Sequence, residues 1–245
     1  MTLAAAGLLS CTGTGQSAFD PASVADASGE VTRVEPLSWW TGMQTPLQLL
    51  VNGAGIAAYD VRHKADSPNY LFVDVEVKPD AEPGTYYLVF SQGERQFKVP
   101  YEIAARAEGS VARKSFTTAD MIYLLMPDRF ANGDASNDST PHTRERADRS
   151  AFFGRHGGDL QGMIDHLDYI AGLGATAVWP TPLLLDDEPE GSYHGYACGD
   201  YYRIDPRFGS NELYREFVGK AHEHGLKVIM DIVTNHCGTG HWWMK

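Results

Sequence analysis

The pattern of apolar residues changes once along the 245-residue chain, between residues 107 and 115, and this change narrows the folds that the sequence can adopt. The first region contains short apolar or alternating runs separated by turn residues, at 47–51, 70–77, 85–90 and 96–103. Several short strands at regular spacing predict a β-sandwich of immunoglobulin-like size. After residue 115 apolar runs alternate with segments of helical spacing, which predicts parallel βαβ units.

In the second region the predicted strands lie at 121–126, 175–179 and 226–233. The run 121–126 is apolar throughout, which is typical of a strand buried on both faces of a parallel sheet. Helical spacing predicts one helix at 160–171. It also predicts a second helix, which Ser210 or Asn211 caps and Gly225 ends.

The composition excludes some classes of protein. Hydrophobic residues make up 43% and charged residues 21% of the chain, and these shares exclude wholesale disorder. A formal net charge of −12 repels phosphate backbones, so we expect no nucleic-acid partner. Aromatic residues make up 11%, which suits a sugar ligand or a large core equally well.

The N-terminus predicts an exported protein. Residues 2–10 are small and apolar and are followed by Cys11, the pattern of a bacterial lipoprotein cleavage site. We expect a lipid anchor on Cys11 and a flexible tether as far as residue 29; an ordinary cleaved signal peptide or a disordered tail are the alternatives. In an exported chain Cys198 and Cys237 could pair, or both could remain buried free thiols.

Five motifs lie at or near the ends of the predicted strands of the second region. They are Pro-Asp-Arg-Phe-Ala-Asn-Gly-Asp at 127–134, Gly-Gly-Asp-Leu-Gln-Gly at 157–162, Tyr-His-Gly-Tyr at 193–196, Asp-Pro-Arg-Phe-Gly at 205–209 and Asp-Ile-Val-Thr-Asn-His at 231–236. In this order and spacing they resemble the α-amylase family, glycoside hydrolase family 13, and within it the cyclomaltodextrinase/neopullulanase branch. Trp-Trp-Thr-Gly-Met at 39–43 is similar to the N-terminal sandwich of the same branch.

The resemblance covers about residues 30–245 and implies a (β/α)₈ TIM barrel whose active site lies at the carboxyl ends of its strands. It divides the chain into a signal and tether at 1–29, an immunoglobulin-like sandwich at 30–108 and a truncated barrel of three βα units at 115–245. The branch includes periplasmic starch-utilisation enzymes of gut bacteria. We therefore expect the periplasm or outer membrane of a Gram-negative bacterium, and a homodimer for the complete enzyme.

The resemblance also implies a retaining glycosidase that hydrolyses α-1,4-glucosidic bonds of starch, maltodextrin, cyclodextrin or pullulan. Retaining glycosidases need two carboxyl groups about 5–5.5 Å apart. In the family these follow strands four and five, and a supporting Asp follows strand seven. We therefore interpret the chain as an N-terminal fragment without catalytic carboxylates and expect it to be inactive. The alternatives are a non-catalytic maltooligosaccharide-binding lipoprotein and a glucan transferase of the same family.

Oxygen-bearing side chains are concentrated after the first predicted strand of the second region. They are Asn132, Asp134, Asn137 and Asp138. Hard oxygen ligands on a loop bent at a glycine suit Ca²⁺, although an Asx-rich surface turn has the same composition. The resemblance completes a structural Ca²⁺ site with the Gly157 carbonyl and the Asp159 carboxylate.

The resemblance assigns substrate-binding roles to three residues. It implies that Tyr196 stacks on the sugar ring beside the scissile bond and that His236 hydrogen-bonds the hydroxymethyl group of that sugar. His194 belongs to the same substrate-binding set, and Asp231 supports neighbouring groups without attacking the substrate. An exposed loop tyrosine and a structural histidine are the alternatives for Tyr196 and His236.

Two further segments have no assigned role. His241 with Trp242 and Trp243 could line a sugar-binding rim or pack against other parts of the protein. The acidic run at 186–190 is interpreted as a solvated loop.

Overall fold

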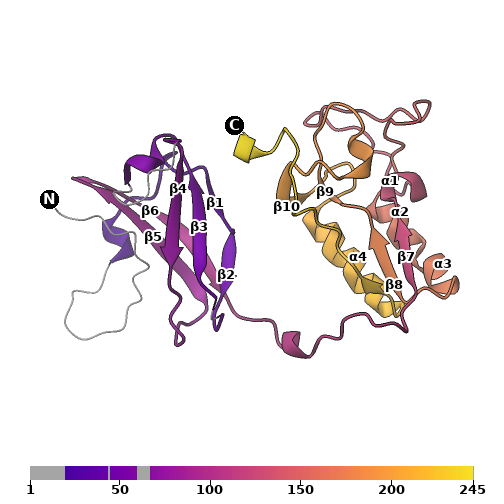
Figure 1. Cartoon of the computed structure of the whole chain (residues 1–245), viewed down its shortest axis with the longest axis horizontal. Coiled ribbons are helices and arrows are strands. Elements are labelled where there is room, and N and C mark those ends of the chain that lie inside the picture. The colour runs from indigo at the N-terminus through magenta and orange to yellow at the C-terminus, as the bar shows by residue number, and fades with distance from the viewer. Residues whose placement is uncertain (1–19, 44, 60–66, 245) are drawn as a thin grey trace. The chain divides into compact units, whose positions relative to one another are not determined.

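The computed structural model describes residues 20–43, 45–59 and 67–244, and the chain divides into two compact units, Met1–Arg113 and Lys114–Lys245. The first unit contains strands β1 to β6, and the second a mixture of strands and helices (Figure 1). The lipid anchor predicted at Cys11 falls outside the described residues and stays a prediction. No helix in the described ranges has the length and apolar character needed to span a bilayer.

Strands β1 to β6 form two three-stranded sheets. These strands are β1 (Arg33–Glu35), β2 (Ser38–Trp40), β3 (Leu47–Asn52), β4 (Tyr70–Val75), β5 (Gly84–Gln92) and β6 (Arg95–Ala104). One sheet has the antiparallel order β1-β3-β4. The other is mixed, with the order β2-β6-β5, because β2 runs parallel to β6 while β5 and β6 form an antiparallel hairpin. Short 3₁₀ segments lie at Pro21–Ser23, Ile56–Tyr59 and Ser110–Ala112.

The two sheets share one apolar core. In β3 the side chains of Leu47, Leu49 and Val51 are buried while the alternate residue Gln48 is exposed, as the period of two requires. Phe90 of β5 and Phe97 of β6 stack with ring centroids 5.1 Å apart in the same cluster. The four predicted strands are confirmed. The prediction missed β1 and β2, because three residues are too few to show a period.

The second unit is built on a parallel sheet of β7 (Ile122–Leu125), β8 (Ala177–Pro180) and β11 (Lys227–Val228), in the order β11-β8-β7. Its helices are α1 (Pro127–Phe130), α2 (Leu160–Asp165), α3 (Leu167–Gly172) and α4 (Asn211–Glu223). Strands β9 (Leu184–Leu185) and β10 (Asp200–Ile204) form a separate two-stranded antiparallel ribbon. Two 3₁₀ segments are η4 (Ser192–His194) and η5 (Trp242–Met244).

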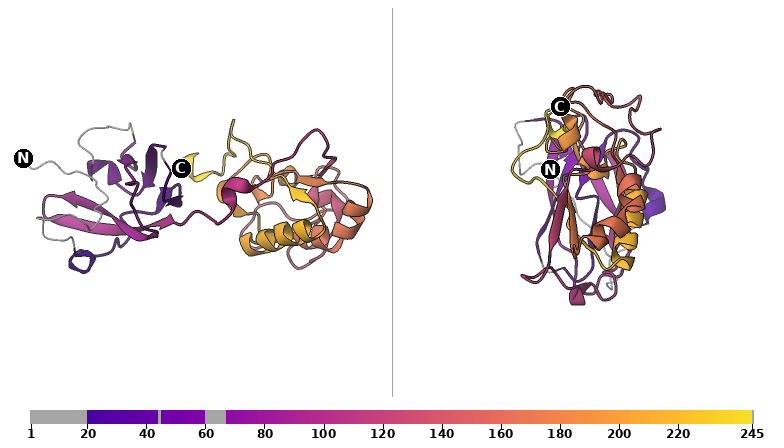
Figure 2. Two further views of the ribbon diagram at one scale, coloured as in Figure 1. Left: turned by 90° about the horizontal axis from the view of Figure 1, so that it is seen from below. Right: turned by 90° about the vertical axis from the view of Figure 1, so that its right-hand side faces the viewer.

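Helices α2, α3 and α4 lie against the sheet of the second unit (Figure 2). Their buried side chains, among them Met163 and Phe217, form one core cluster with Val178 of β8. The side chain of Ser210 accepts a hydrogen bond from Leu213 N at 3.1 Å, so Ser210 is the N-cap of α4. The parallel strands and both helical regions are therefore confirmed.

The helix predicted at 160–171 is interrupted at His166, where the backbone leaves the helical region and separates α2 from α3. The third strand is shorter than predicted, since only Lys227–Val228 pairs regularly with β8. Beyond it, a single hydrogen bond from Ile229 N to Val178 O continues the alignment.

The prediction that 121–126 is buried on both faces is wrong for the described residues. Leu125 is 5% exposed, but Ile122 is 39% and Leu124 57% exposed. Successive side chains of a strand point to opposite faces of its sheet. Leu125 packs in the core cluster with the helices, while Ile122 and Leu124 point to a face that the described residues leave open.

Candidate active site

One carboxylate oxygen connects the ends of two strands and the loop between β9 and β10. Asp231 Oδ2 accepts hydrogen bonds from the Tyr196 hydroxyl at 3.2 Å and from Trp179 Nε1 at 3.1 Å. Trp179 belongs to β8, and Asp231 follows β11 by three residues. Burial raises the pKa of Tyr196, and the charge of the neighbouring Asp231 carboxylate raises it further. Asp231 therefore fixes where the Tyr196 ring stands.

His236 lies against the same tyrosine. Its Nε2 is 3.1 Å from the Tyr196 carbonyl oxygen. The hydroxyl of Tyr201 lies 3.0 Å from the His236 carbonyl and 2.9 Å from that of Val233, so β10 supports the backbone of this segment. The structure thus brings together Tyr196, His236 and Asp231, as expected for residues at the carboxyl ends of neighbouring parallel strands.

His194 is held in the tight turn that precedes Tyr196. Its Nδ1 accepts a hydrogen bond from Tyr196 N at 2.9 Å, with the left-handed Gly195 (φ +78°) between the two residues. Burial lowers the pKa of His194, which favours the neutral ring. Because Nδ1 is the acceptor, the remaining proton is on Nε2, and a neutral His194 presents that N–H as a donor.

The prediction that 186–190 is a solvated loop is wrong for Asp186 and Glu188, whereas Pro189 and Glu190 are exposed as predicted. Asp186 is fully buried, and its carboxylate accepts hydrogen bonds from Ala197 N at 3.1 Å and Glu188 N at 3.2 Å. Burial raises the pKa of Asp186 to about 6. The Glu188 carboxylate accepts from the backbone and hydroxyl of Thr239 at 2.7 and 2.8 Å. These acidic groups satisfy backbone donors of distant loops, a role that local composition does not reveal.

A buried cluster of charged residues stabilises the loops of the candidate site. Asp205 and Arg207 form a two-point pair, with Nε 2.9 Å from Oδ1 and Nη2 2.8 Å from Oδ2. Arg155 Nη1 lies 3.8 Å from Asp205 Oδ2, and none of the three residues is more than 1% exposed. Arg207 also donates to the carbonyl of Glu145 at 2.9 Å.

Glu145 extends this cluster to the loop that carries His194. Its carboxylate accepts hydrogen bonds from both the backbone and the hydroxyl of Ser192 at 2.6 Å, and from Gly191 N at 3.1 Å. No local pattern in the sequence predicts a role for Glu145 or Arg155. The Asp-Pro-Arg-Phe-Gly motif was the available signal, because it contains the acidic and basic partners of the cluster.

The predicted calcium loop is organised by Asp159, the buried N-cap of α2. One of its carboxylate oxygens accepts from Gly133 N at 3.0 Å and Gly162 N at 2.7 Å. The other accepts from Asp134 N at 2.8 Å and Asn137 Nδ2 at 3.2 Å. Asp159 therefore holds the loop through three hydrogen bonds and caps α2 through the fourth.

The other candidate ligands fall into two groups. Asn132 Nδ2 lies 2.6 Å from Asp138 Oδ1, and a Cβ placed on Gly157 would lie 2.4 Å from that oxygen, so these three residues converge. Asn137 Oδ1 is buried without a hydrogen-bond partner. Asp134 is engaged elsewhere, because its carboxylate accepts from the Ser136 hydroxyl at 2.6 Å, a bond that lowers the pKa of Asp134.

Three of the candidate ligands, Asn132, Asn137 and Asp138, suit a hard cation. The unpartnered amide oxygen of Asn137 lies in the same loop as the convergent Asn132 and Asp138, and amide and carboxylate oxygens are the ligands that Ca²⁺ takes. Within the described ranges, no group of three or more His, Cys, Asp or Glu side chains is arranged to hold a metal ion. A cation here would therefore depend on amide and carbonyl oxygens in addition to the Asp138 carboxylate.

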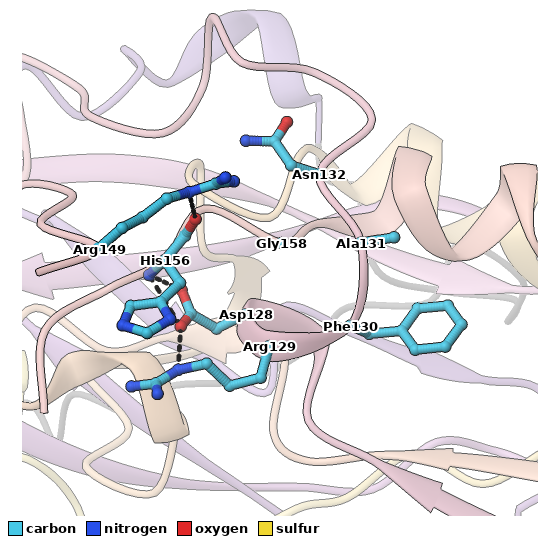
Figure 3. A pocket seen from close by; sticks show the side chains of 8 residues that line it. All are labelled: Asp128, Arg129, Phe130, Ala131, Asn132, Arg149, His156 and Gly158. Carbon is cyan, nitrogen blue, oxygen red and sulfur yellow. Dashed lines mark hydrogen bonds and ion pairs between the residues drawn. The ribbon is translucent and has the colours of Figure 1, made fainter. Parts of the chain in front are cut away.

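A pocket of about 600 Å³ lies beside this loop (Figure 3). Its lining consists of Asp128, Arg129, Phe130, Ala131, Asn132, Arg149, His156 and Gly158. The buried Asp128 carboxylate accepts from Arg129 Nε at 2.7 Å and from His156 N at 2.9 Å. These bonds hold the first strand-end loop against residues 156–158.

Two family models match the chain. The model described as the N-terminal domain of cyclomaltodextrinase matches residues 33–107, and the one described as the catalytic domain of alpha amylase matches residues 124–245. The chain is 46% identical over 125 residues to a cyclomaltodextrinase of Thermoanaerobacter pseudethanolicus and 43% identical over 130 residues to neopullulanase 2 of Thermoactinomyces vulgaris. Each match covers 50% of this chain and 21% of the relative.

A solved structure of an Anoxybacillus α-amylase is 42% identical, with 51% of this chain and 26% of that chain covered and a TM-score of 0.46. The strand-end geometry and both family models agree on the class of protein. The chain belongs to the α-amylase family, and it corresponds to the N-terminal part of the cyclomaltodextrinase-like branch. Its matched segment spans about a fifth of the length of the curated relatives named above.

Proposed function

We propose that the second unit carries part of the substrate-binding site of a retaining α-glucan hydrolase that acts on α-1,4-glucosidic bonds. The observation that carries the proposal is the convergence of Tyr196, His236 and Asp231 at the carboxyl ends of adjacent parallel strands. Sites in (β/α)₈ barrels are built at this end of the strands. The relatives' names, cyclomaltodextrinase and neopullulanase, support α-glucans as the substrate class.

The proposal includes the fold of the whole domain. The three parallel strands lie side by side in chain order, and right-handed βα crossovers in that order are how such a barrel begins. The exposed Ile122 and Leu124 lie on the sheet face opposite the helices, where the interior of a barrel would cover them. We further propose that the first unit is the immunoglobulin-like sandwich of the same branch.

Tyr196, His194 and His236 each have a definite part in the proposed binding of the sugar. The Tyr196 ring is 38% exposed and its hydroxyl is anchored to Asp231, so a fixed aromatic face is available to a sugar ring. Such a face favours the positive charge that develops at the anomeric carbon. His194 Nδ1 and His236 Nε2 bond to the Tyr196 backbone, so the nitrogens proposed to meet sugar hydroxyls are His194 Nε2 and His236 Nδ1.

We propose that the 245-residue polypeptide binds α-glucans without cleaving them. Its described residues supply three parallel strands, and the carboxylates of the retaining mechanism follow the fourth and fifth strands of the family's barrel. Asp231 does not replace them, because its Oδ2 is occupied by Tyr196 and Trp179.

The test is titration of the polypeptide with maltoheptaose by isothermal calorimetry, alongside an assay for released reducing ends. We expect binding without release, and about tenfold weaker binding by Tyr196→Ala because a sugar–ring contact contributes roughly 1–1.5 kcal/mol. Tyr202→Ala is the matched control, since Tyr202 is also 38% exposed but lies on β10. Unchanged binding by Tyr196→Ala, or turnover by clean protein, would contradict the proposal.

We also propose a structural Ca²⁺ held by Asn132, Asn137, Asp138 and the Gly157 carbonyl. Ligation by Asp134 or Asp159 would require the release of hydrogen bonds that their carboxylates accept in this structure. Bound Ca²⁺ would supply positive charge that fixes the loop after β7. The unpartnered Asn137 oxygen and the convergence of Asn132 on Asp138 support this proposal.

Calcium at a hundredfold excess over its dissociation constant is expected to stabilise the second unit by about 2.7 kcal/mol, seen as a rise in its thermal midpoint. Asp138→Asn should abolish this rise. The matched control is Asp148→Asn, which should retain the rise in thermal midpoint. Asp148 accepts from the Ser150 hydroxyl at 2.6 Å, just as Asp134 accepts from Ser136, but Asp148 lies outside the proposed calcium loop. A wild-type midpoint that is the same with Ca²⁺ and with chelator would exclude the site.

A further inference from the structure

The cysteines of the second unit lie in segments that run side by side. Cys198 is buried at 2% exposure two residues after Tyr196, and Cys237 is half-buried directly after His236. Gly238 N donates a hydrogen bond to Cys198 O at 2.8 Å. The peptide group that joins Cys237 to Gly238 is therefore paired with the one that joins Cys198 to Gly199.

This pairing brings the backbones of the two cysteines close together, as a disulfide requires. Each Cα is one bond from the hydrogen-bonded peptide groups, and disulfides span Cα separations of about 4.4–6.8 Å. A Cβ on Gly238 would lie 2.4 Å from Ala197 O, so the two segments approach as closely as a glycine allows. Both thiols are free in this structure.

The two thiols also interact electrostatically. Burial raises the pKa of Cys198 to about 12, and the charges of Asp200 and Asp186, followed by the Cys237 thiol, add to the rise. The pair together raises the pKa of Tyr201, after the larger effect of burial. These shifts accompany the backbone hydrogen bond between Gly238 and Cys198, which is the geometric evidence for the pairing.

We propose that Cys198 and Cys237 form an oxidisable pair whose disulfide joins the segment carrying Tyr196 to the segment carrying His236. The bond would close a long loop between two strand ends that the hydrogen bonds of Tyr201 and His236 already hold together. Its effect on sugar binding rests on the proposed function, but its formation does not.

The reaction is thiol–disulfide exchange with a small disulfide such as oxidised glutathione. The more accessible Cys237 thiolate attacks first, forms a mixed disulfide and releases one glutathione thiolate. The Cys198 thiolate then attacks the Cys237 sulfur and releases the second. Two protein thiols lose two electrons, the oxidant becomes two thiols, and the protein's two thiol protons go to the released thiolates. The raised pKa of Cys198 makes the second exchange the slow step.

The experiment uses the full chain with Cys11→Ser, so that Cys198 and Cys237 are its remaining cysteines. After oxidation with glutathione disulfide, the protein is alkylated in denaturant and digested with trypsin without reduction. We expect peptide 156–203 to be linked to peptide 228–245, with dithiothreitol separating them. Two alkylated cysteines, glutathione retained on Cys237, or a link between two protein molecules would each overturn the proposal.

A second measurement needs no peptide mapping. Closing a loop of this length constrains the unfolded chain, so oxidation should raise the thermal midpoint of the second unit by roughly 5–10 °C, reversibly with dithiothreitol. Cys237→Ser, in the same Cys11→Ser background, should show no such rise. A rise of equal size in Cys237→Ser would mean that oxidation acts elsewhere. No sugar enters either measurement, so failure here is distinct from failure of the proposed function.

Discussion

Asp205→Asn is expected to destabilise the second unit by about 3–5 kcal/mol, because it removes the carboxylate from a buried ion cluster and leaves two guanidinium groups uncompensated. Arg155 and Arg207 are each 1% exposed, and Asp205 is fully buried. Burial alone would raise the pKa of Asp205, but hydrogen bonds from Arg207 and the charge of Arg155 hold that pKa below its ordinary value. The native fold therefore depends on the ionised form.

The effect should be confined to residues 114–245, so hydrogen exchange read peptide by peptide in increasing denaturant is the suitable measurement. Glu216→Gln is the matched control. Glu216 pairs with Lys220 on α4 at 2.9 Å with both side chains about half exposed, and such pairs contribute only about 0.3–0.5 kcal/mol. Equal losses in the two variants, or a loss shared by peptides of the first unit, would show that the buried cluster is not the cause.

The parts of the fold that the sequence predicted are those with a local signal. Leu47, Leu49 and Val51 alternate over one short strand, and the Ser210 hydroxyl caps α4 by accepting from the backbone only three residues ahead. The exposure of Ile122 and Leu124 had no local signal. An apolar run indicates that its residues tolerate burial. Whether other parts of the protein cover both faces of the strand depends on segments distant in the sequence.

The same division applies to the candidate site. Tyr196 and His236 were predicted to lie together because strand-end residues of a parallel sheet meet at one edge, and the structure places them in contact. Arg155, Glu145 and Asp186 were missed. The hydrogen bond between Arg207 and Glu145 joins residues 62 apart, and irregular loops with no period position both partners. Long-range polar pairing of this kind becomes visible only once the fold is known.

Gly195→Ala is expected to destabilise the second unit by at least about 3 kcal/mol and to abolish binding of maltoheptaose. Gly195 has φ +78°, and a Cβ at this position would lie 2.0 Å from the Pro182 carbonyl oxygen. Because that atom belongs to the backbone, a side-chain rotation does not relieve the overlap. The turn between His194 and Tyr196 must shift, which breaks the 2.9 Å bond from Tyr196 N to His194 Nδ1 and moves the tyrosine away from Asp231.

Gly191→Ala separates the steric effect from the effect of backbone conformation. Gly191 lies in the same loop with φ +74°, but no atom lies within 4 Å of a Cβ placed there. Gly191→Ala is therefore destabilised only by the left-handed backbone conformation that the alanine must adopt, which costs about 1–2 kcal/mol. Thermal unfolding and calorimetric titration should show Gly191→Ala retaining most of its binding while Gly195→Ala loses it. If both variants bind equally well, the close approach of Gly195 to Pro182 does not position Tyr196, and the site must be held by Asp231 alone.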